Sequence, residues 1–148
     1  HFSPLGKIEM TKIPVFGLIY KRIVVMIDRS SKESREQSVN ALKKDIENGQ
    51  SILIFPEGTM NKINTSLSEF YDGAFRIAIE TQTPIMPFVI LKNRDLLPRV
   101  NPLKAHPGFL TTLFITTVDV TGLTLDDLPQ LKEKIFNLMQ EAIIKNDG

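Results

Sequence analysis

The sequence predicts an α/β fold, with a mostly parallel central sheet covered by helices on both faces. Two observations support this prediction. Short apolar runs alternate along the chain with segments of helical periodicity, and the runs are apolar at successive positions, as in strands that are buried on both sides. A length of 148 residues suits one domain, so we expect residues 1–148 to form a single domain.

The first half of the chain contains a strand, a helix and a second strand. The run RIVVMID at residues 22–28 predicts a buried strand. Capping residues follow this run and predict a helix over about residues 31–48, which Gly49 can end. The second strand is expected over residues 51–55, where Pro56 stops it.

The second half repeats the alternation. A helix is expected over about residues 70–82, and a strand over residues 83–92. Pro84 and Pro87 in this strand belong to its first residues or to a sheet edge, because proline cannot donate a hydrogen bond within a sheet. The last strand is expected over residues 110–120, and an amphipathic helix over residues 124–146. The apolar stripe of this last helix consists of Leu131, Ile135, Leu138, Ala142 and Ile143.

The composition excludes several classes of function. The chain has no cysteine, which excludes disulfides and thiolate zinc sites, and its two histidines, His1 and His106, are too few for a histidine-rich metal site. We expect no metal and no bound organic cofactor. The net charge of +1 gives no whole-chain argument for binding nucleic acid. No run approaches the roughly 18 apolar residues of a transmembrane helix.

Polar side chains follow two of the predicted strands. Arg29 follows the first strand, and Glu57, Gly58 and Thr59 follow the second. In parallel sheets, ligands collect beyond the carboxyl ends of the strands. We therefore expect two neighbouring strand ends to share one ligand site.

The residue types at these ends suit a ligand that carries a phosphate and a hydroxyl. The guanidinium of Arg29 can bind a phosphate with two hydrogen bonds. Glu57 offers an acceptor for a hydroxyl, Thr59 adds a hydroxyl, and Gly58 allows a close approach of the backbone. Taken singly, each group also fits a solvated turn or an exposed helix start, and this alternative remains open.

Four segments occur in a fixed order between residues 7 and 90: KIEMTKIPVFG, IDRS, ILIFPEGT and FYDGAFRIAIETQTPIMPFVI. This order resembles the glycerophospholipid acyltransferase family, whose best-known members are lysophosphatidic acid acyltransferases. The resemblance implies transfer of a fatty acyl group from acyl-CoA or acyl-ACP, used as a co-substrate, to the free hydroxyl of a lysophospholipid. The expected acceptor is 1-acyl-glycerol-3-phosphate, which would give phosphatidic acid.

The same resemblance implies roles for individual residues. Arg29 would hold the phosphate of the acceptor, Glu57, Gly58 and Thr59 would shape the acceptor pocket, and Pro87 matches the proline of the family's fourth block. The implied partners are the two lipid substrates, a membrane surface and acyl carrier protein. The implied location is a membrane, on its cytoplasmic side.

The family's catalytic pair is a histidine with an aspartate five positions later, and this pair is missing from the chain. His1 is the only histidine before the FPEGT segment, and the residue five positions later is Gly6. We therefore expect residues 1–148 to lack an N-terminal part that carries the pair. The alternative is a non-catalytic lipid-binding or partner-binding domain of the same fold.

Two further departures remove positive charge from the expected phosphate site. Met60-Asn61 stands where the family usually has a basic residue and a serine, and Tyr71-Asp72 replaces a frequent lysine. Lys21, Lys62 or Arg76 would have to compensate.

The segment GLIYKRIVV at residues 17–25 fits two interpretations. Its apolar residues and two cations suit a surface that lies against anionic lipid. They equally suit a buried transition from helix to strand.

Overall fold

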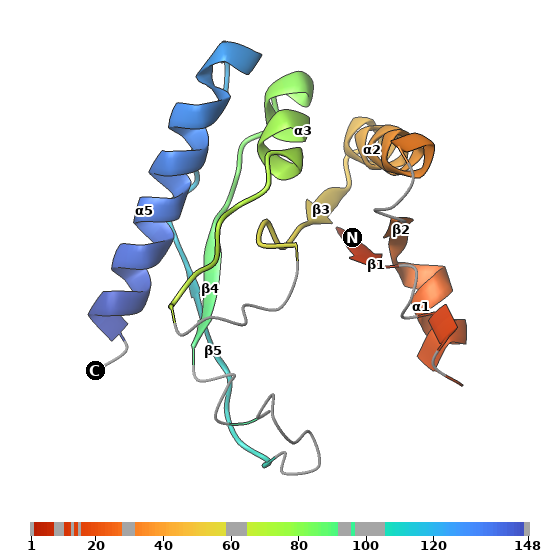
Figure 1. Cartoon of the computed structure of the whole chain (residues 1–148), viewed down its shortest axis with the longest axis horizontal. Coiled ribbons are helices and arrows are strands. Elements are labelled where there is room, and N and C mark those ends of the chain that lie inside the picture. Colours follow the sequence, from red (N-terminus) through yellow and green to blue (C-terminus); the bar gives the residue numbers. More distant parts are fainter. Residues whose placement is uncertain are drawn as a thin grey trace.

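The structure is a computed structural model that describes residues 2–7, 11–12, 14, 16–27, 32–58, 65–91, 96 and 106–146. Helices and strands alternate through most of this part of the chain (Figure 1). In chain order the elements are β1 (Phe2–Lys7), α1 (Phe16–Ile23), β2 (Val25–Ile27), α2 (Lys32–Glu47), β3 (Ser51–Leu53), α3 (Gly73–Thr81), β4 (Phe88–Leu91), β5 (Thr111–Phe114), the 3-10 turn η3 (Leu125–Asp127) and α5 (Leu128–Asn146).

Three strands form a parallel sheet in the order β2-β1-β3. The two outer strands pair with different halves of β1: β3 lies beside Phe2–Pro4, and β2 lies beside Leu5–Lys7. Helix α2 connects β2 to β3 and packs against both. This part of the structure confirms the predicted α/β class, in which a crossover helix joins parallel strands.

The other two strands, β4 and β5, form an antiparallel pair. An isolated bridge between Ile85 and Val118 continues this pairing beyond the strands. Helix α5 runs alongside the pair in Figure 1 and packs against β4. The sheet structure of the described residues is therefore mixed, because its C-terminal part is antiparallel.

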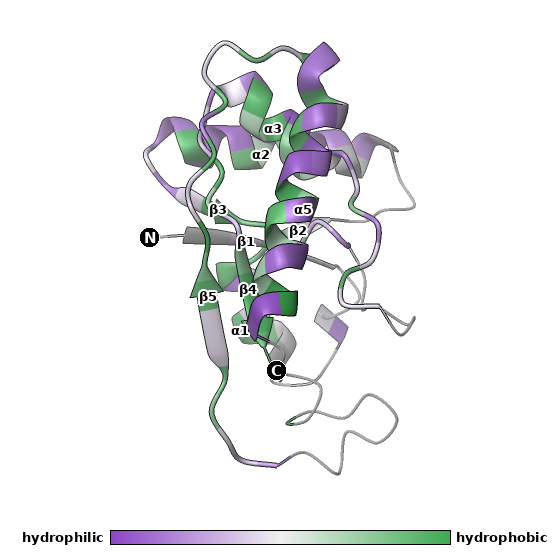
Figure 2. Ribbon diagram, turned by 90° about the vertical axis from the view of Figure 1, so that its left-hand side faces the viewer, coloured by the Kyte–Doolittle hydropathy of each residue, from purple (hydrophilic) through white to green (hydrophobic). Residues whose placement is uncertain are grey.

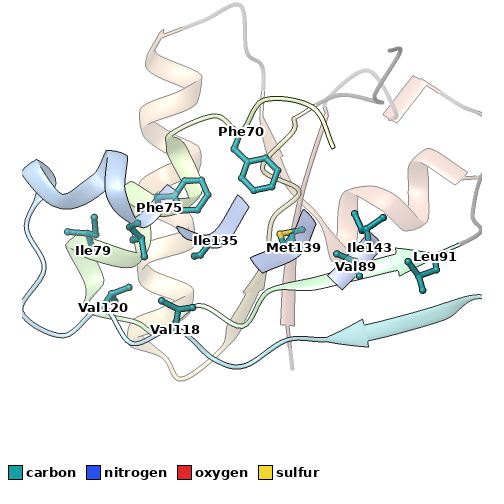
Figure 3. Packing of buried hydrophobic residues seen from close by; sticks show 11 residues of the cluster. Phe70, Phe75, Ile79, Val89, Leu91, Val118, Val120, Ile135, Met139 and Ile143 are labelled. Atoms are coloured by element: carbon teal, nitrogen blue, oxygen red, sulfur yellow. The ribbon is translucent and has the colours of Figure 1, made fainter. Parts of the chain in front are cut away.

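The main hydrophobic core lies between α3, α5 and the β4–β5 pair (Figure 3). Phe75 on α3 and Ile135 on α5 are each only 2 % exposed, and Val120 is fully buried. The predicted stripe on the last helix is confirmed at Leu131, Ile135 and Ile143, while Leu138 and Ala142 are half-buried against the same cluster. Met139, which the prediction omitted, completes the buried face.

All four predicted strands are shorter in the structure. The strand expected over residues 51–55 ends at Leu53, and the one expected over residues 83–92 spans only Phe88–Leu91. The strand expected over residues 22–28 begins only at Val25, because Arg22 and Ile23 belong to α1. The strand expected over residues 110–120 contains only β5, and its C-terminal part returns to the core through Val118. The prediction missed β1 entirely.

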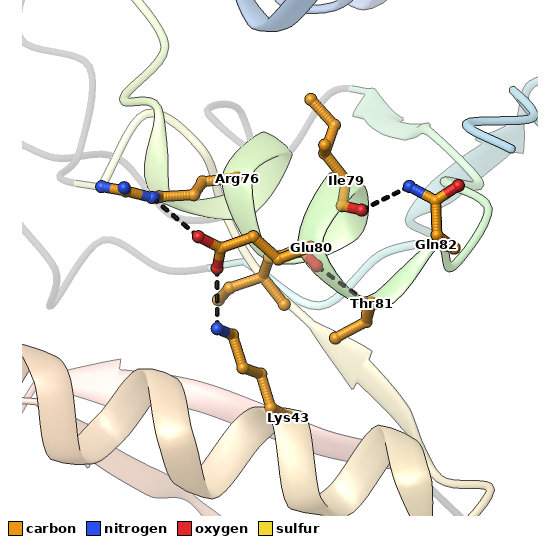
Figure 4. A network of polar contacts seen from close by, with 7 residues as sticks. Lys43, Arg76, Ile79, Glu80, Thr81 and Gln82 are labelled. Atoms are coloured by element: carbon orange, nitrogen blue, oxygen red, sulfur yellow. Dashed lines mark hydrogen bonds and ion pairs between the residues drawn. The ribbon is translucent and has the colours of Figure 1, made fainter. Parts of the chain in front are cut away.

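Helix α3 ends at a residue with unusual backbone geometry. Gln82 has a φ of 50°, in the left-handed region that favours glycine. Its side chain offsets this strain, because Nε2 donates to the carbonyl of Ile79 at 2.6 Å (Figure 4). In addition, Oε1 accepts from the N–H of Gly122 at 2.7 Å. Gln82 thus ties the end of α3 to the turn that precedes η3.

A polar network connects α2 to α3. Lys43 of α2 lies 2.7 Å from one carboxylate oxygen of Glu80, and Nε of Arg76 donates to the other oxygen at 3.1 Å (Figure 4). Chiefly through the hydrogen bond from Lys43, the pKa of Glu80 is lowered below its ordinary value of 4.5. A lowered pKa means that the ionised carboxylate stabilises the fold above the ordinary value, and that this stabilisation is lost as the pH falls through the folded value.

We predict that Lys43→Gln lowers the free energy of unfolding by less than about 1 kcal/mol near pH 7, because both groups are partly exposed. The difference from wild type should disappear in acid, where Glu80 is protonated in both proteins. Urea denaturation across this pH range, with a carboxyl NMR titration of Glu80, measures both effects. Lys44→Gln on the same helix is the control. A difference that persists unchanged below the pKa of Glu80 would contradict the assignment.

Candidate functional site

The FPEG segment forms a tight turn directly after β3. The N–H of Gly58 donates to the carbonyl of Phe55 at 3.0 Å and closes the turn around Pro56 and Glu57. Proline is favoured at the second position of such turns because its φ is already restricted. Gly58 has a φ of +64°, so the predicted need for a glycine here has a backbone reason. Glu57 and Gly58 are both half-buried.

The chain returns to this turn at residues 68–71. The N–H of Ser68 donates to Oε2 of Glu57 at 2.7 Å, and the N–H of Tyr71 donates to the carbonyl of Pro56 at 2.9 Å. Both hydrogen bonds reach the turn just before α3 begins at Gly73. One carboxylate oxygen of Glu57 therefore fixes the returning segment in place.

Pro87 and β4 lie on another side of the turn. The ring of Phe55 meets the ring of Phe88 edge to face at a centroid distance of 6.4 Å, and Phe88 contacts Phe114 at 5.8 Å. Pro87 itself is buried, and its carbonyl accepts from the N–H of Ile115 at 2.9 Å. Its position immediately before β4 agrees with the predicted start of that strand. The structure thus brings Glu57, Gly58 and the Pro87 segment together through Phe55.

Arg29 and Thr59, the other two predicted site residues, lie outside the described residues, so their roles stay predictions. The strand that leads to Arg29 is described and ends at Ile27. Because β2 and β3 are parallel to β1, their carboxyl ends face the same edge of the sheet. The prediction that these two strand ends are neighbours was wrong, because β1 lies between them. Two strand spacings separate β2 from β3 by about 10 Å.

Two of the charged side chains that follow the turn in sequence, Asp72 and Arg76, are paired with other side chains. Asp72 lies 2.6 Å from Nζ of Lys132 on α5, which offsets the negative charge that replaces the family's lysine. Nε of Arg76 is hydrogen-bonded to Glu80, so this part of its guanidinium is occupied. Lys62 and the side chain of Lys21 lie outside what the structure describes. The compensation expected from these three cations stays a prediction.

The described part of the chain offers neither a metal-binding cluster nor a membrane-spanning helix. Within it, no group of three His, Asp or Glu side chains is arranged to hold a metal ion. His106 is exposed in the segment that leads to β5. None of the helices in the described ranges is long and apolar enough to cross a membrane.

Sequence reasoning missed the residues that hold the turn. Ser68 and Tyr71 act through backbone N–H groups, which every residue except proline possesses. No side-chain type at these positions could have signalled the contact. The Phe55–Phe88 contact was equally invisible, because it joins residues 33 positions apart through packing.

Comparisons with known proteins identify the family of the chain. The family model described as Acyltransferase matches residues 1–91, which contain the turn and Pro87. The chain is 30% identical over 132 residues to a putative 1-acyl-sn-glycerol-3-phosphate acyltransferase, acl-2, of Caenorhabditis elegans, covering 88% of this chain and 46% of that protein. It is also 30% identical over 145 residues to the 1-acyl-sn-glycerol-3-phosphate acyltransferase of Haemophilus influenzae, covering 97% of this chain and 59% of that protein.

A solved structure supports the fold. The crystal structure of the 1-acyl-sn-glycerophosphate (LPA) acyltransferase PlsC of Thermotoga maritima superposes with a TM-score of 0.77 at 21% identity, covering 99% of this chain and 57% of that chain. This chain spans about half the length of the curated relatives it matches. From the family model and the two relatives together, the chain belongs to the acyltransferase family.

Proposed function

We propose that the protein containing this chain transfers a fatty acyl group from an acyl thioester to the free hydroxyl of 1-acyl-glycerol-3-phosphate, which yields phosphatidic acid. The observation that carries the proposal is the pinned FPEG turn beside the Pro87 segment, within the region that matches the acyltransferase model. The relatives bear names of this same activity. The thioester is acyl-CoA or acyl-ACP, and the reaction takes place at a membrane surface on its cytoplasmic side.

In this proposal residues of this chain bind and orient the acceptor. The lipid head group occupies the carboxyl edge of the β2-β1-β3 sheet, with its phosphate on Arg29 and its glycerol portion against Glu57, Gly58 and Thr59. The Ser68 N–H already holds Oε2 of Glu57, so the carboxylate is oriented before substrate arrives. Such preorganisation avoids an entropic cost when the substrate binds.

The chemical step is attack of the acceptor hydroxyl oxygen on the thioester carbonyl carbon. A general base takes the hydroxyl proton, the new ester C–O bond forms, and the C–S bond breaks, so that a thiolate leaves and becomes a free thiol. By resemblance the base is a histidine with an aspartate five positions later, which we place outside residues 1–148. The chain would supply the site that binds the acceptor, and the base would take the proton from the hydroxyl of the bound acceptor.

The direct test uses the full-length protein with an acyl thioester and 1-acyl-glycerol-3-phosphate. We expect release of free thiol above the rate without enzyme, together with formation of phosphatidic acid measured by mass spectrometry. Thiol release that never exceeds the background, in a protein that still binds the lysophospholipid, would favour the alternative of a non-catalytic lipid-binding domain.

We predict that the two functions of Glu57 can be separated by substitution. In Glu57→Gln the amide oxygen can still accept from the Ser68 N–H, so thermal stability should stay close to wild type. Loss of the charge should nevertheless lower kcat/KM for the acceptor by about tenfold or more, as expected for a charge-assisted hydrogen bond. Glu57→Ala should lower both quantities. Wild-type kcat/KM in Glu57→Gln would restrict Glu57 to holding the loop.

Arg29→Ala should raise the acceptor KM and leave the KM of the acyl donor nearly unchanged, because only the acceptor carries the phosphate that Arg29 would bind. Losing one desolvated charge-assisted contact should cost about 2–5 kcal/mol of acceptor binding. Steady-state kinetics with each substrate varied in turn measure the effect. Lys44→Ala, on the exposed side of α2, is the control. An unchanged acceptor KM would remove Arg29 from the site.

A further inference from the structure

Helix α1 presents apolar side chains to solvent. Leu18 is 72 % exposed, Ile19 is 59 % exposed and Ile23 is 60 % exposed. In Figure 2 the green of apolar residues runs along much of this helix, and in Figure 1 it lies at the edge of the molecule. These three large aliphatic side chains on one eight-residue helix form an exposed apolar patch. Such patches are unfavourable in water and mark surfaces that contact a partner or a membrane.

The opposite side of α1 packs against the rest of the fold. Gly17 is buried, and a Cβ at this position would collide with the backbone carbonyl of Thr11. A Cβ at Gly6 of β1 would likewise collide with the Tyr20 hydroxyl. Gly17 and Tyr20 therefore face inward, and this orientation leaves Leu18, Ile19 and Ile23 facing outward.

The exposed side also carries positive charge. Arg22 is exposed and lies four residues after Leu18 and three after Ile19, so helical geometry places it among the aliphatic side chains. The helix contains no acidic residue, and Lys12 just before it is exposed as well. An aliphatic surface with a cation inside it matches the boundary of an anionic bilayer, where acyl chains meet phosphate groups.

Helix α1 packs against the sheet that carries the proposed site. Tyr20 lies against Gly6, which precedes Lys7 at the carboxyl end of β1. The carboxyl ends of β2 and β3 face the same edge of the sheet. Helix α1 therefore packs next to the carboxyl half of β1, with its patch on the side of the helix that faces away from the sheet.

We propose that the patch formed by Leu18, Ile19, Arg22 and Ile23 docks this protein onto the surface of an anionic membrane, with the three aliphatic side chains inserted among the lipids and Arg22 at the level of their phosphates. This surface deepens the proposed function, because it names the part of the chain that meets the membrane holding the substrate. Long cationic side chains reach the head groups in this way while their stems stay in apolar surroundings.

The test measures binding of the full-length protein to vesicles of pure phosphatidylcholine and of phosphatidylcholine mixed with phosphatidylglycerol. The double variant Leu18→Ser, Ile19→Ser should lose about tenfold or more in partitioning onto the mixed vesicles. Arg22→Gln should lose about fivefold on mixed vesicles and little on pure phosphatidylcholine. The matched control is Leu125→Ser, Ile144→Ser, which alters one exposed Leu and one exposed Ile elsewhere and should bind like wild type.

If another part of the full-length protein also binds membranes, the variants could partition onto vesicles like wild type. A fluorescence probe on α1 then tests directly whether this helix enters the membrane. Residues 1–148 contain no tryptophan, so Ile19→Trp introduces a local probe once any tryptophan elsewhere in the full-length protein has been replaced by phenylalanine. Its emission should shift to the blue when vesicles are added, whereas that of Ile144→Trp on α5 should not. Absence of a shift overturns the proposal. A blue-shifted emission before vesicles are added also overturns it, because a second copy or another segment would then cover the patch.

Turnover of a water-soluble, short-chain acceptor and thioester separates this proposal from the proposed function. The double variant at Leu18 and Ile19 should turn over soluble substrates like wild type, because it removes only the contact with the membrane. If wild type has no turnover at all, the proposed function fails, while the vesicle measurements still decide the role of α1.

Discussion

Strand β1 is the element on which the arrangement of the site depends. β2 and β3 each pair with β1, which stands between them, and the parallel hydrogen bonding of β1 directs both strand ends to one edge. The staggered register matters as well, since β3 occupies the first half of β1 and β2 the second half. Without β1 the segment before Arg29 and the turn at Glu57 would have no common frame. The same strand seats α1, through the contact between Gly6 and Tyr20.

The alternation of strands and helices was predictable because apolar periodicity records which faces are buried. The helices α2, α3 and α5 were expected close to their observed bounds, and so was the start of β4 after Pro87. β1 escaped prediction because Pro4 and Gly6 lie within it, and both residue types are disfavoured inside strands. A transition from helix to strand at residues 17–25 was one of two interpretations, and the structure has it in α1 and β2. It is not buried as that interpretation expected, because Leu18, Ile19 and Ile23 face outward.

The site was predictable only where side-chain chemistry determined it. The turn at Pro56–Gly58 follows from residue types that restrict or release the backbone, and the structure places it where expected. The segment that closes over the turn contributes backbone N–H groups, so no pattern of side chains announces it. The prediction that the two strand ends are adjacent was wrong. The sequence order of β2 and β3 does not reveal that β1, the first strand of the chain, lies between them.

Charge and position together constrain how a lipid could meet this fold. Asp72 is paired with Lys132, whereas Arg76 shares the single carboxylate of Glu80 with Lys43, so that cluster keeps one net positive charge. These contacts hold the charged groups away from a ligand, so binding of a phosphate at the edge would depend chiefly on Arg29 and on docking at the membrane. A helix that lies on the bilayer next to the carboxyl half of β1 would hold that edge close to the lipid head groups. The acceptor would then reach the site by diffusing within the bilayer, without having to leave it for water. The high local concentration of lipid at the membrane would compensate for the small number of cations at the site.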